Sequence, residues 1–206
     1  MKEQEYLKDL TEIRSIMERS ARFISLSGLS GVMAGIYALI GAFIAYHIIY
    51  KSPYVLYDSI RAHELSGGIT FLVLDAVVVL ALAVATGMYL TYRKALKNGQ
   101  KIWDKTSKRL LLNLFLPLVA GGLFIIIIFW RGFFSLISPL ILIFYGMALI
   151  NASNHTVRDV RYLGISEIIL GLVAALLPGY GLFFWAFGFG VLHIFYGLVM
   201  YLKYDR

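Results

Sequence analysis

Long, almost uninterrupted apolar runs are the feature that most limits what this chain can fold into. The runs have 17 to 28 residues, and an α-helix needs about 20 residues to cross a bilayer core of ~30 Å. The runs lie at residues 23–50, 67–92, 110–130, 133–150, 161–177 and 182–202. They raise the hydrophobic content to 60%, whereas a soluble domain has about 45–50%. The sequence therefore predicts an all-α polytopic membrane bundle of about six transmembrane helices.

The first 21 residues differ from the rest of the chain because they are polar but periodic. Tyr6, Leu10, Ile13 and Met17 recur at helical spacing, and charged residues occupy the other faces. This pattern predicts an amphipathic helix that lies on the cytoplasmic membrane surface or packs under the bundle, with a partner-binding helix as the alternative. Residues 22–206 then form the six-helix transmembrane domain.

Basic residues fall strongly on one side of the expected spans. Sixteen Lys and Arg lie in segments on the side of the two termini, and three, Lys51, Arg61 and Arg131, lie on the other side. The positive-inside rule therefore predicts a multi-pass protein of the inner (plasma) membrane with both termini cytoplasmic. The net charge of +7 is explained in this way, so the lipid bilayer and not nucleic acid is the expected partner.

Small residues form helical stripes on three of the spans. The glycines of these stripes are Gly28, Gly31, Gly35, Gly164, Gly171, Gly190 and Gly197. In lipid, helices associate where small residues let their backbones approach. The stripes predict tight packing among the first, fifth and sixth spans, or a homo-oligomer face.

Ionisable residues at membrane depth are costly and therefore informative. Glu167 and His193 lie on the stripes of the fifth and sixth spans, at similar depths in the cytoplasmic half. We expect them to approach each other, with Asn113 of the third span joining them. The cluster is either structural or part of a proton or ion pathway.

A second polar cluster is expected in the outer half of the bilayer. Asp75 of the second span and His47 of the first span have comparable depths, and Tyr46 is the neighbour of His47. Loop residues His63 and Glu64 could cap this cluster. The same two interpretations, structural or ion-conducting, apply here.

Two prolines lie within the predicted third and fourth spans, at positions 117 and 139. Proline removes a helical hydrogen bond and kinks a helix interior. Interrupted membrane helices occur at transport sites, but proline is also tolerated for structural reasons.

Motifs for catalysis or cofactor binding are missing from the sequence. The chain has no cysteine, which excludes disulfides and thiolate metal sites. It has no HExxH, GxSxG, Walker or GxGxxG pattern at a suitable place. Haem ligation by His47 and His193 fits poorly because their depths differ. We expect no enzyme activity, no cofactor and no metal.

The most patterned segment is LGISEIILGLVAALLPGYGLFFWAFGFGVLHIFYGLVMY, residues 163–201. It resembles the hairpins of small six-span bacterial inner-membrane proteins such as the HdeD-type acid-resistance family. The shared features are two glycine-spaced helices and a proline-centred turn. The resemblance implies an acid-stress role, while the N-terminal helix and the long basic loop depart from it.

Three functions follow as hypotheses, and a membrane enzyme or cofactor carrier is the last of them. The first is a non-enzymatic accessory or stress-related membrane protein that acts through oligomers or an unknown protein partner. The alternative is a small secondary transporter or proton pathway that uses Glu167, His193 and Asp75.

Overall fold

The computed structural model describes residues 27–50, 66–99 and 103–205, and every regular element within them is a helix. The all-α architecture expected from the sequence is therefore confirmed. The amphipathic helix predicted over residues 1–21 lies outside the described residues, as do His63 and Glu64.

The described helices follow the predicted spans closely. The first five long helices are α2 Gly28–Tyr50, α3 Ser66–Lys97, α4 Lys105–Trp130, α5 Ile137–Ala152 and α6 Asp159–Leu176. The last span consists of α7 Gly181–Trp185, a π-helical segment η3 Ala186–Leu192, and α8 His193–Tyr204. Short 3₁₀ turns, η1 Phe134–Leu136 and η2 Ser153–His155, flank α5.

Five of these helical segments are long and apolar enough to cross a membrane. They comprise α2, α3, α4, α5 with its flanking turns, and the continuous α7–η3–α8 rod. The multi-pass membrane character of the chain is thereby confirmed. The sixth segment, α6, has 18 residues but contains Asp159, Arg161 and Glu167, so its composition keeps it out of this set.

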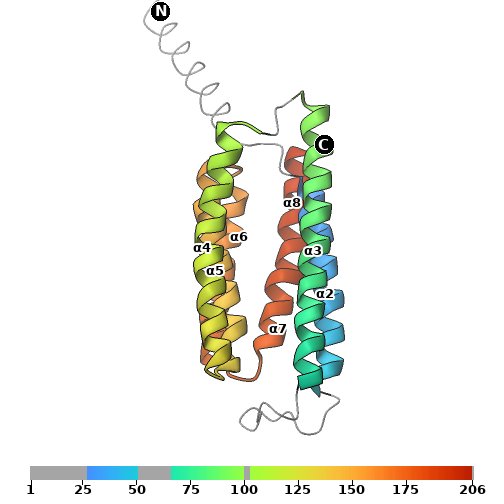
Figure 1. Ribbon diagram of the computed structural model, residues 1–206. Coiled ribbons are helices and arrows are strands. Elements are labelled where there is room, and N and C mark those ends of the chain that lie inside the picture. The colour runs from blue at the N-terminus through green and yellow to red at the C-terminus, as the bar shows by residue number, and fades with distance from the viewer. Residues whose placement is uncertain (1–26, 51–65, 100–102, 206) are drawn as a thin grey trace, which may run out of the picture.

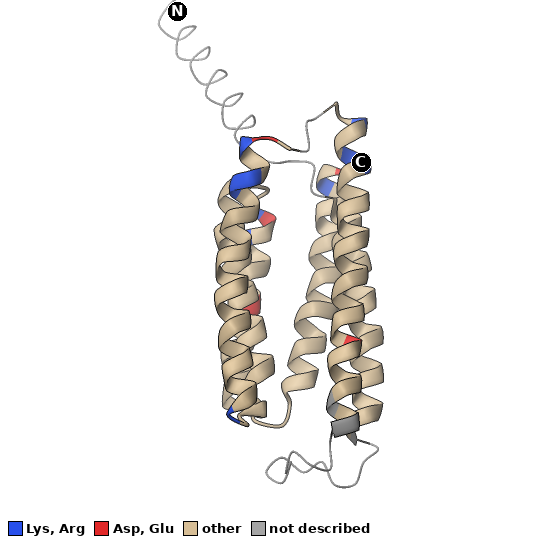
Figure 2. Ribbon diagram, viewed as in Figure 1, with Lys and Arg blue, Asp and Glu red and all other residues tan. Residues whose placement is uncertain are grey.

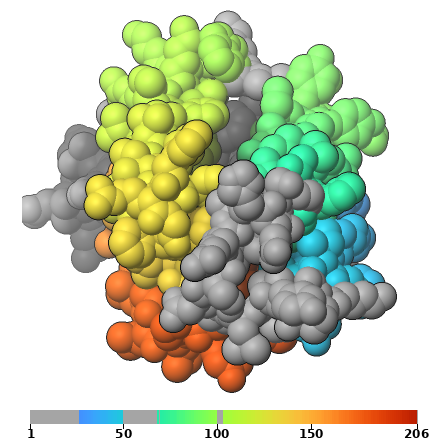
Figure 3. Space-filling model, turned by 60° about the horizontal axis from the view of Figure 1, so that its bottom comes forward, coloured from blue at the N-terminus to red at the C-terminus, as the bar shows by residue number. Residues whose placement is uncertain are grey.

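Two groups of three helices stand side by side (Figure 1). In one group α2 lies between α3 and the η3–α8 rod, and in the other α5 lies between α4 and α6. Helix α7 lies where the groups meet and contacts both central helices, α2 and α5. Figure 3 shows the end of the molecule where α7 begins. Any site between α6 and α8 therefore lies at the junction of the two groups.

Glycines bring α2 and α8 into backbone contact. A Cβ added to Gly28 would lie 2.6 Å from the carbonyl oxygen of Gly197, and one added to Gly197 would lie 2.6 Å from the nitrogen of Val32. Farther along, a Cβ on Gly35 would lie 2.6 Å from the oxygen of Gly190. This is the close small-residue packing that helices use in lipid. Ala38, Ala42 and Ala45 continue the buried face of α2.

The stripe of α6 packs against a helix that the sequence did not indicate. A Cβ on Gly164 would lie 2.7 Å from the oxygen of Gly146 in α5, and one on Gly171 would lie 2.9 Å from the oxygen of Pro139. The glycines of this stripe therefore pack on α5, a helix that the expected packing among the first, fifth and sixth spans did not include. Gly146 is a single glycine in its span, so no stripe marked α5 as the partner.

The two prolines occupy different positions in their helices. Pro117 lies in the interior of α4. Pro139 is the third residue of α5, in the first turn, where no intrahelical amide bond is lost. The expectation of an interior proline in the fourth span is therefore wrong, because η1 precedes α5 and moves its start to Ile137.

The helix ends are charged on one side and almost uncharged on the other (Figure 2). At the end where α3 stops and α4 begins lie nine described Lys and Arg residues: Arg93, Lys94, Lys97, Lys105, Lys108, Arg109, Arg158, Arg161 and Lys203. Arg131 is the one described basic residue at the opposite end. Between the ends the helices present apolar side chains outward; none of the most apolar stretch of α3 is buried. Such a surface suits lipid.

Asp104 begins α4 at the basic end as an N-cap. Its Oδ1 accepts hydrogen bonds from the backbone N–H and the hydroxyl of Ser107, each at 2.7 Å. The Ser107 backbone hydrogen bond lowers the pKa of Asp104 below its ordinary value, because it stabilises the carboxylate. The start of α4 is thus fixed by a charged cap outside the apolar segment.

Candidate functional site

Glu167 and His193 lie together at the junction of the two helix groups. Glu167, on α6, has no exposed surface, and His193, the first residue of α8, is 7% exposed. His193 Nδ1 is 3.5 Å from Glu167 Oε1. The structure thus brings together the two residues that the stripe argument paired.

Both ring nitrogens of His193 have partners. Nδ1 lies 2.9 Å from the carbonyl oxygen of Gly188, and Nε2 lies 2.7 Å from the hydroxyl of Tyr145. A carbonyl oxygen only accepts, so Nδ1 carries a hydrogen. In the neutral ring, Nε2 then accepts from the Tyr145 hydroxyl. The imidazole is therefore held at both ends, by its own rod and by α5.

Glu167 is the least satisfied polar group in the described part of the chain. Neither carboxyl oxygen has a hydrogen-bond partner among the described residues, although both are fully buried. Gly188 lies directly against the carboxyl group, since a Cβ there would be 2.4 Å from Oε2. A charged carboxylate without donors at membrane depth costs several kcal/mol. The site therefore favours the protonated acid or a carboxylate beside an imidazolium.

Aromatic rings surround the histidine. Tyr145 and Phe189 both stack on His193, with centroid separations of 5.4 and 5.6 Å. Trp185 lies against Phe189 at 5.2 Å. Such packing keeps water from the ring and strengthens electrostatic interactions inside the site.

The histidine follows a π-helical stretch. Residues 186–192 are wound as a π-helix, and Gly188, which contacts both Glu167 and His193, lies within it. Single π-turns inside α-helices are rare and occur frequently at functional sites. The sequence analysis did not identify this winding, because no local pattern in residues 186–192 marks a π-helix.

Two further polar contacts lie along the α6–α8 contact, between the Glu167 site and the basic end of the molecule. At the end, Tyr204 donates a hydrogen bond of 2.7 Å to Asp159, and Lys203 lies 3.1 Å from the same carboxylate. Farther in, the hydroxyls of Ser166 and Tyr196 are 3.5 Å apart. We call these residues, with Glu167 and His193, the α6–α8 polar ladder. From Asp159 to Glu167 it covers about 12 Å of helix rise.

The predicted third member of this site is elsewhere. The Asn113 side-chain amide donates to the carbonyl oxygen of Arg109 at 2.8 Å. Its hydrogen bond is satisfied within α4, so it does not reach Glu167 or His193. Tyr145 of α5 takes the expected place, and the sequence analysis missed it because α5 carries no polar stripe.

Among the described residues, no hydrogen bond or ion pair joins Asp75 to His47 or Tyr46 of the predicted outer cluster. His47 Nδ1 lies 2.9 Å from the carbonyl oxygen of Phe43, four residues earlier in α2. Asp75 instead faces Gly41, where an added Cβ would be 3.2 Å from Oδ2. Tyr46 packs edge-on against His47 and Phe183. The expected pairing of Asp75 with His47 or Tyr46 is therefore wrong, because glycine lets Asp75 approach a different part of α2.

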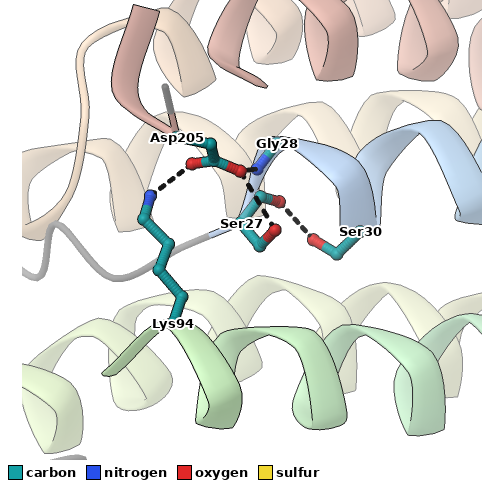
Figure 4. A network of polar contacts seen from close by, with 5 residues as sticks. All are labelled: Ser27, Gly28, Ser30, Lys94 and Asp205. Atoms are coloured by element: carbon teal, nitrogen blue, oxygen red, sulfur yellow. Dashed lines mark hydrogen bonds and ion pairs between the residues drawn. The ribbon is translucent and has the colours of Figure 1, made fainter. Parts of the chain in front are cut away.

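A second polar network lies at the basic end (Figure 4). Asp205 Oδ2 accepts from the backbone nitrogen of Gly28 at 2.9 Å and from the hydroxyl of Ser27 at 3.1 Å. Lys94 Nζ lies 2.5 Å from Asp205 Oδ1. One carboxylate thus joins the start of α2, the end of α3 and the end of α8.

No described cluster of three or more His, Asp or Glu side chains could hold a metal ion in residues 27–50, 66–99 and 103–205. No protein-family model, curated protein or solved structure matches this chain.

Proposed function

We propose that this protein is a small secondary transporter or proton pathway, and that Glu167, His193 and Tyr145 form its proton-binding site. The observation that supports the proposal most directly is Glu167, a fully buried carboxyl group without a hydrogen-bond partner in the described part of the chain, 3.5 Å from a histidine. Structural buried carboxyl groups are normally hydrogen-bonded. An ionisable residue within a membrane is a functional candidate when its partner is also ionisable.

The pair can hold one proton in two arrangements. Either Glu167 is the neutral acid beside a neutral imidazole, or it is a carboxylate beside the imidazolium of His193. Both arrangements have zero net charge, so neither places an isolated charge in a medium of low dielectric constant. Because Nδ1 already carries a hydrogen, the second proton of the imidazolium is bound at Nε2, beside Tyr145. The Tyr145 hydroxyl can donate to the neutral ring and accept from the imidazolium.

The position of the site supports movement as well as binding. Glu167 and Tyr145 belong to the α4–α5–α6 group, and His193 belongs to the α2–α3–α8 group. A change in the proton position therefore alters the contact between the two groups.

We further propose that the basic end faces the cytoplasm of a plasma membrane, on the basis of the described distribution of Lys and Arg. The chain has no cysteine, so single cysteines at Lys105 and Arg131 can be labelled from one side. A membrane-impermeant maleimide added to intact cells should label the second position and spare the first. The reverse labelling would contradict the orientation.

Infrared difference spectroscopy across pH tests proton binding directly. The wild-type protein in lipid should show a carboxylic-acid band that Glu167→Gln lacks. Asp104→Asn is the matched control, because it removes one carboxylate outside the membrane and asparagine is an equally good N-cap. If the band persists in Glu167→Gln, or is absent from the wild type at every pH, Glu167 is not a proton site.

Proteoliposomes loaded with a pH-sensitive dye test transport. Under an imposed potential, the wild type and Asp104→Asn should acidify the lumen faster than protein-free vesicles, and Glu167→Gln should not. Size-exclusion chromatography shows whether the variant remains folded. Equal proton flux through the wild type and a folded Glu167→Gln would contradict the transport proposal.

The exposed face of α3 favours a second candidate, a non-enzymatic accessory or stress-related protein that acts through partners or oligomers. None of the apolar stretch of α3 is buried, and a Cβ on Gly87 would contact nothing within 4 Å. A partner helix could pack there. Cross-linking from a photoreactive residue at Gly87 in cells should then trap one defined product, and growth at low pH should depend on the gene. Cross-links to lipid alone, with normal acid survival, would contradict this candidate.

A further inference from the structure

An open pocket of about 370 Å³ lies at the basic end, beside the Asp205 network. Its lining comprises Ser27, Leu90, Arg93, Lys94, Lys97 and Asp205. Three of these side chains are cationic and one is anionic. None of them belongs to the Glu167 site, so this pocket is independent of the proposed transport function.

The charges of the pocket do not cancel. Asp205 is engaged with Lys94 at 2.5 Å and with the start of α2. Arg93 and Lys97 form no ion pair with a carboxylate of the described residues, and both side chains are exposed. They lie four residues apart on α3, and side chains at this spacing share one helix face. The side chains of Arg93 and Lys97 therefore bring two positive charges to the same pocket.

The pocket lining is apolar on its deeper side and charged on its outer side. Leu90 lies one turn before Arg93 and Lys94 and is thus deeper in the apolar segment. Arg93 is held over the ring of Tyr89, with its guanidinium carbon 5.9 Å from the centroid. A guanidinium supplies a fork of donors that fits phosphate oxygens. The hydroxyl of Ser27 is already used on Asp205, so the cations provide the recognition.

We infer that this pocket binds a phosphate-bearing anion, either the headgroup of an anionic lipid or a free phosphate. The phosphate contacts Arg93 and Lys97, and Leu90 provides the apolar side that an acyl or glycerol group requires. Lys94 and Asp205 form one side of the pocket. This side is fixed in place because their ion pair joins the end of α3 to α2 and α8 (Figure 4).

Binding of three soluble probes to the full chain in detergent tests the inference. Short-chain phosphatidylglycerol and inorganic phosphate carry the anion, and short-chain phosphatidylcholine is the uncharged comparison. The double variant Arg93→Gln/Lys97→Gln removes the two cations of the pocket. Arg109→Gln/Lys105→Gln removes the same charges from the same end of the molecule but outside the pocket, and it serves as the control.

The wild type and the control should bind phosphatidylglycerol with equal affinity, and the pocket variant should bind about 25-fold more weakly, or about fivefold for each removed charge. Phosphatidylcholine should bind weakly to all three. If inorganic phosphate shows the same pattern, the free ion is a sufficient ligand; if it does not, the lipid is the source. Equal losses in both double variants would show diffuse surface charge only and would overturn the inference, as would the absence of anion-dependent binding to the wild type. Thermal unfolding of both variants should show that neither has lost its fold.

Discussion

Substituting Gly197 by alanine tests whether the α2–α8 contact holds the bundle together. Gly197 faces the backbone of α2, where an added Cβ would lie 2.6 Å from the nitrogen of Val32 and 2.9 Å from the oxygen of Gly28. Gly122 of α4 provides the matched control, because a Cβ there would meet nothing within 4 Å. Both substitutions add one methyl group to a membrane helix.

The expected difference follows from the geometry. Ordinary contact begins at 3.4 Å, so the Gly197→Ala methyl group is about 0.8 Å too close to backbone atoms that cannot rotate away. The helices must separate, at a cost of about 1–3 kcal/mol for overpacking. Alanine also gains about 0.5–1 kcal/mol over glycine inside a helix. That gain is common to both variants, so the difference between them isolates the contact.

Reversible unfolding in mixed micelles measures this difference. Gly122→Ala should be as stable as the wild type or slightly more stable, and Gly197→Ala should be less stable than Gly122→Ala by about 1–3 kcal/mol. Equal stability of the two variants would refute the argument, because it would mean that α2 and α8 do not meet at this glycine.

Three further predictions concern polar groups. Tyr145→Phe removes the donor to His193 Nε2 and should cost about 1–2 kcal/mol of stability on unfolding; no loss would mean that the hydrogen bond does not form in lipid. Asp205→Asn should speed hydrogen exchange at the Gly28 amide and lower stability by about 1–3 kcal/mol, because the charge that holds Lys94 is lost; unchanged exchange would contradict a role for Asp205 as a clamp. Since the Ser107 backbone hydrogen bond lowers the pKa of Asp104, its stabilising effect is complete above the unfolded pKa of about 4 and is lost as the pH falls through the lower folded value. Ser107 amide protection should fall over that range, and Asp104→Asn should abolish the dependence.

Periodicity in the sequence was sufficient for the helices and for one half of the candidate site. Glu167 and His193 were paired correctly because both lie on small-residue stripes, and a stripe faces another helix. The stripes did not predict which helix each of them contacts. Gly164 contacts Gly146 of α5, and a single glycine in an apolar span is not distinguishable from a lipid-facing one.

The depth of a residue along its helix predicted its contacts less well than the helix face on which the residue lies. Asn113 has a suitable depth, but its amide bonds the carbonyl oxygen four residues earlier, which is always available in a helix. His47 uses the carbonyl oxygen of Phe43 in the same way. Tyr145 was missed because tyrosine is common in membrane helices and no pattern marks the one that meets a histidine. The π-helix of residues 186–192 has no local signal in the sequence.

The contact between α2 and α8 has a consequence for how the protein is made. Gly28 and Asp205, which are hydrogen-bonded, lie 177 positions apart in the sequence. During synthesis α2 is therefore inserted into the membrane before α8 exists, so its glycine face is uncovered. This face stays uncovered until nearly all of the remaining described chain has been translated. Insertion intermediates expose a surface that any small-residue helix can occupy, so the completion of the last hairpin is the step that commits the chain to its native neighbours.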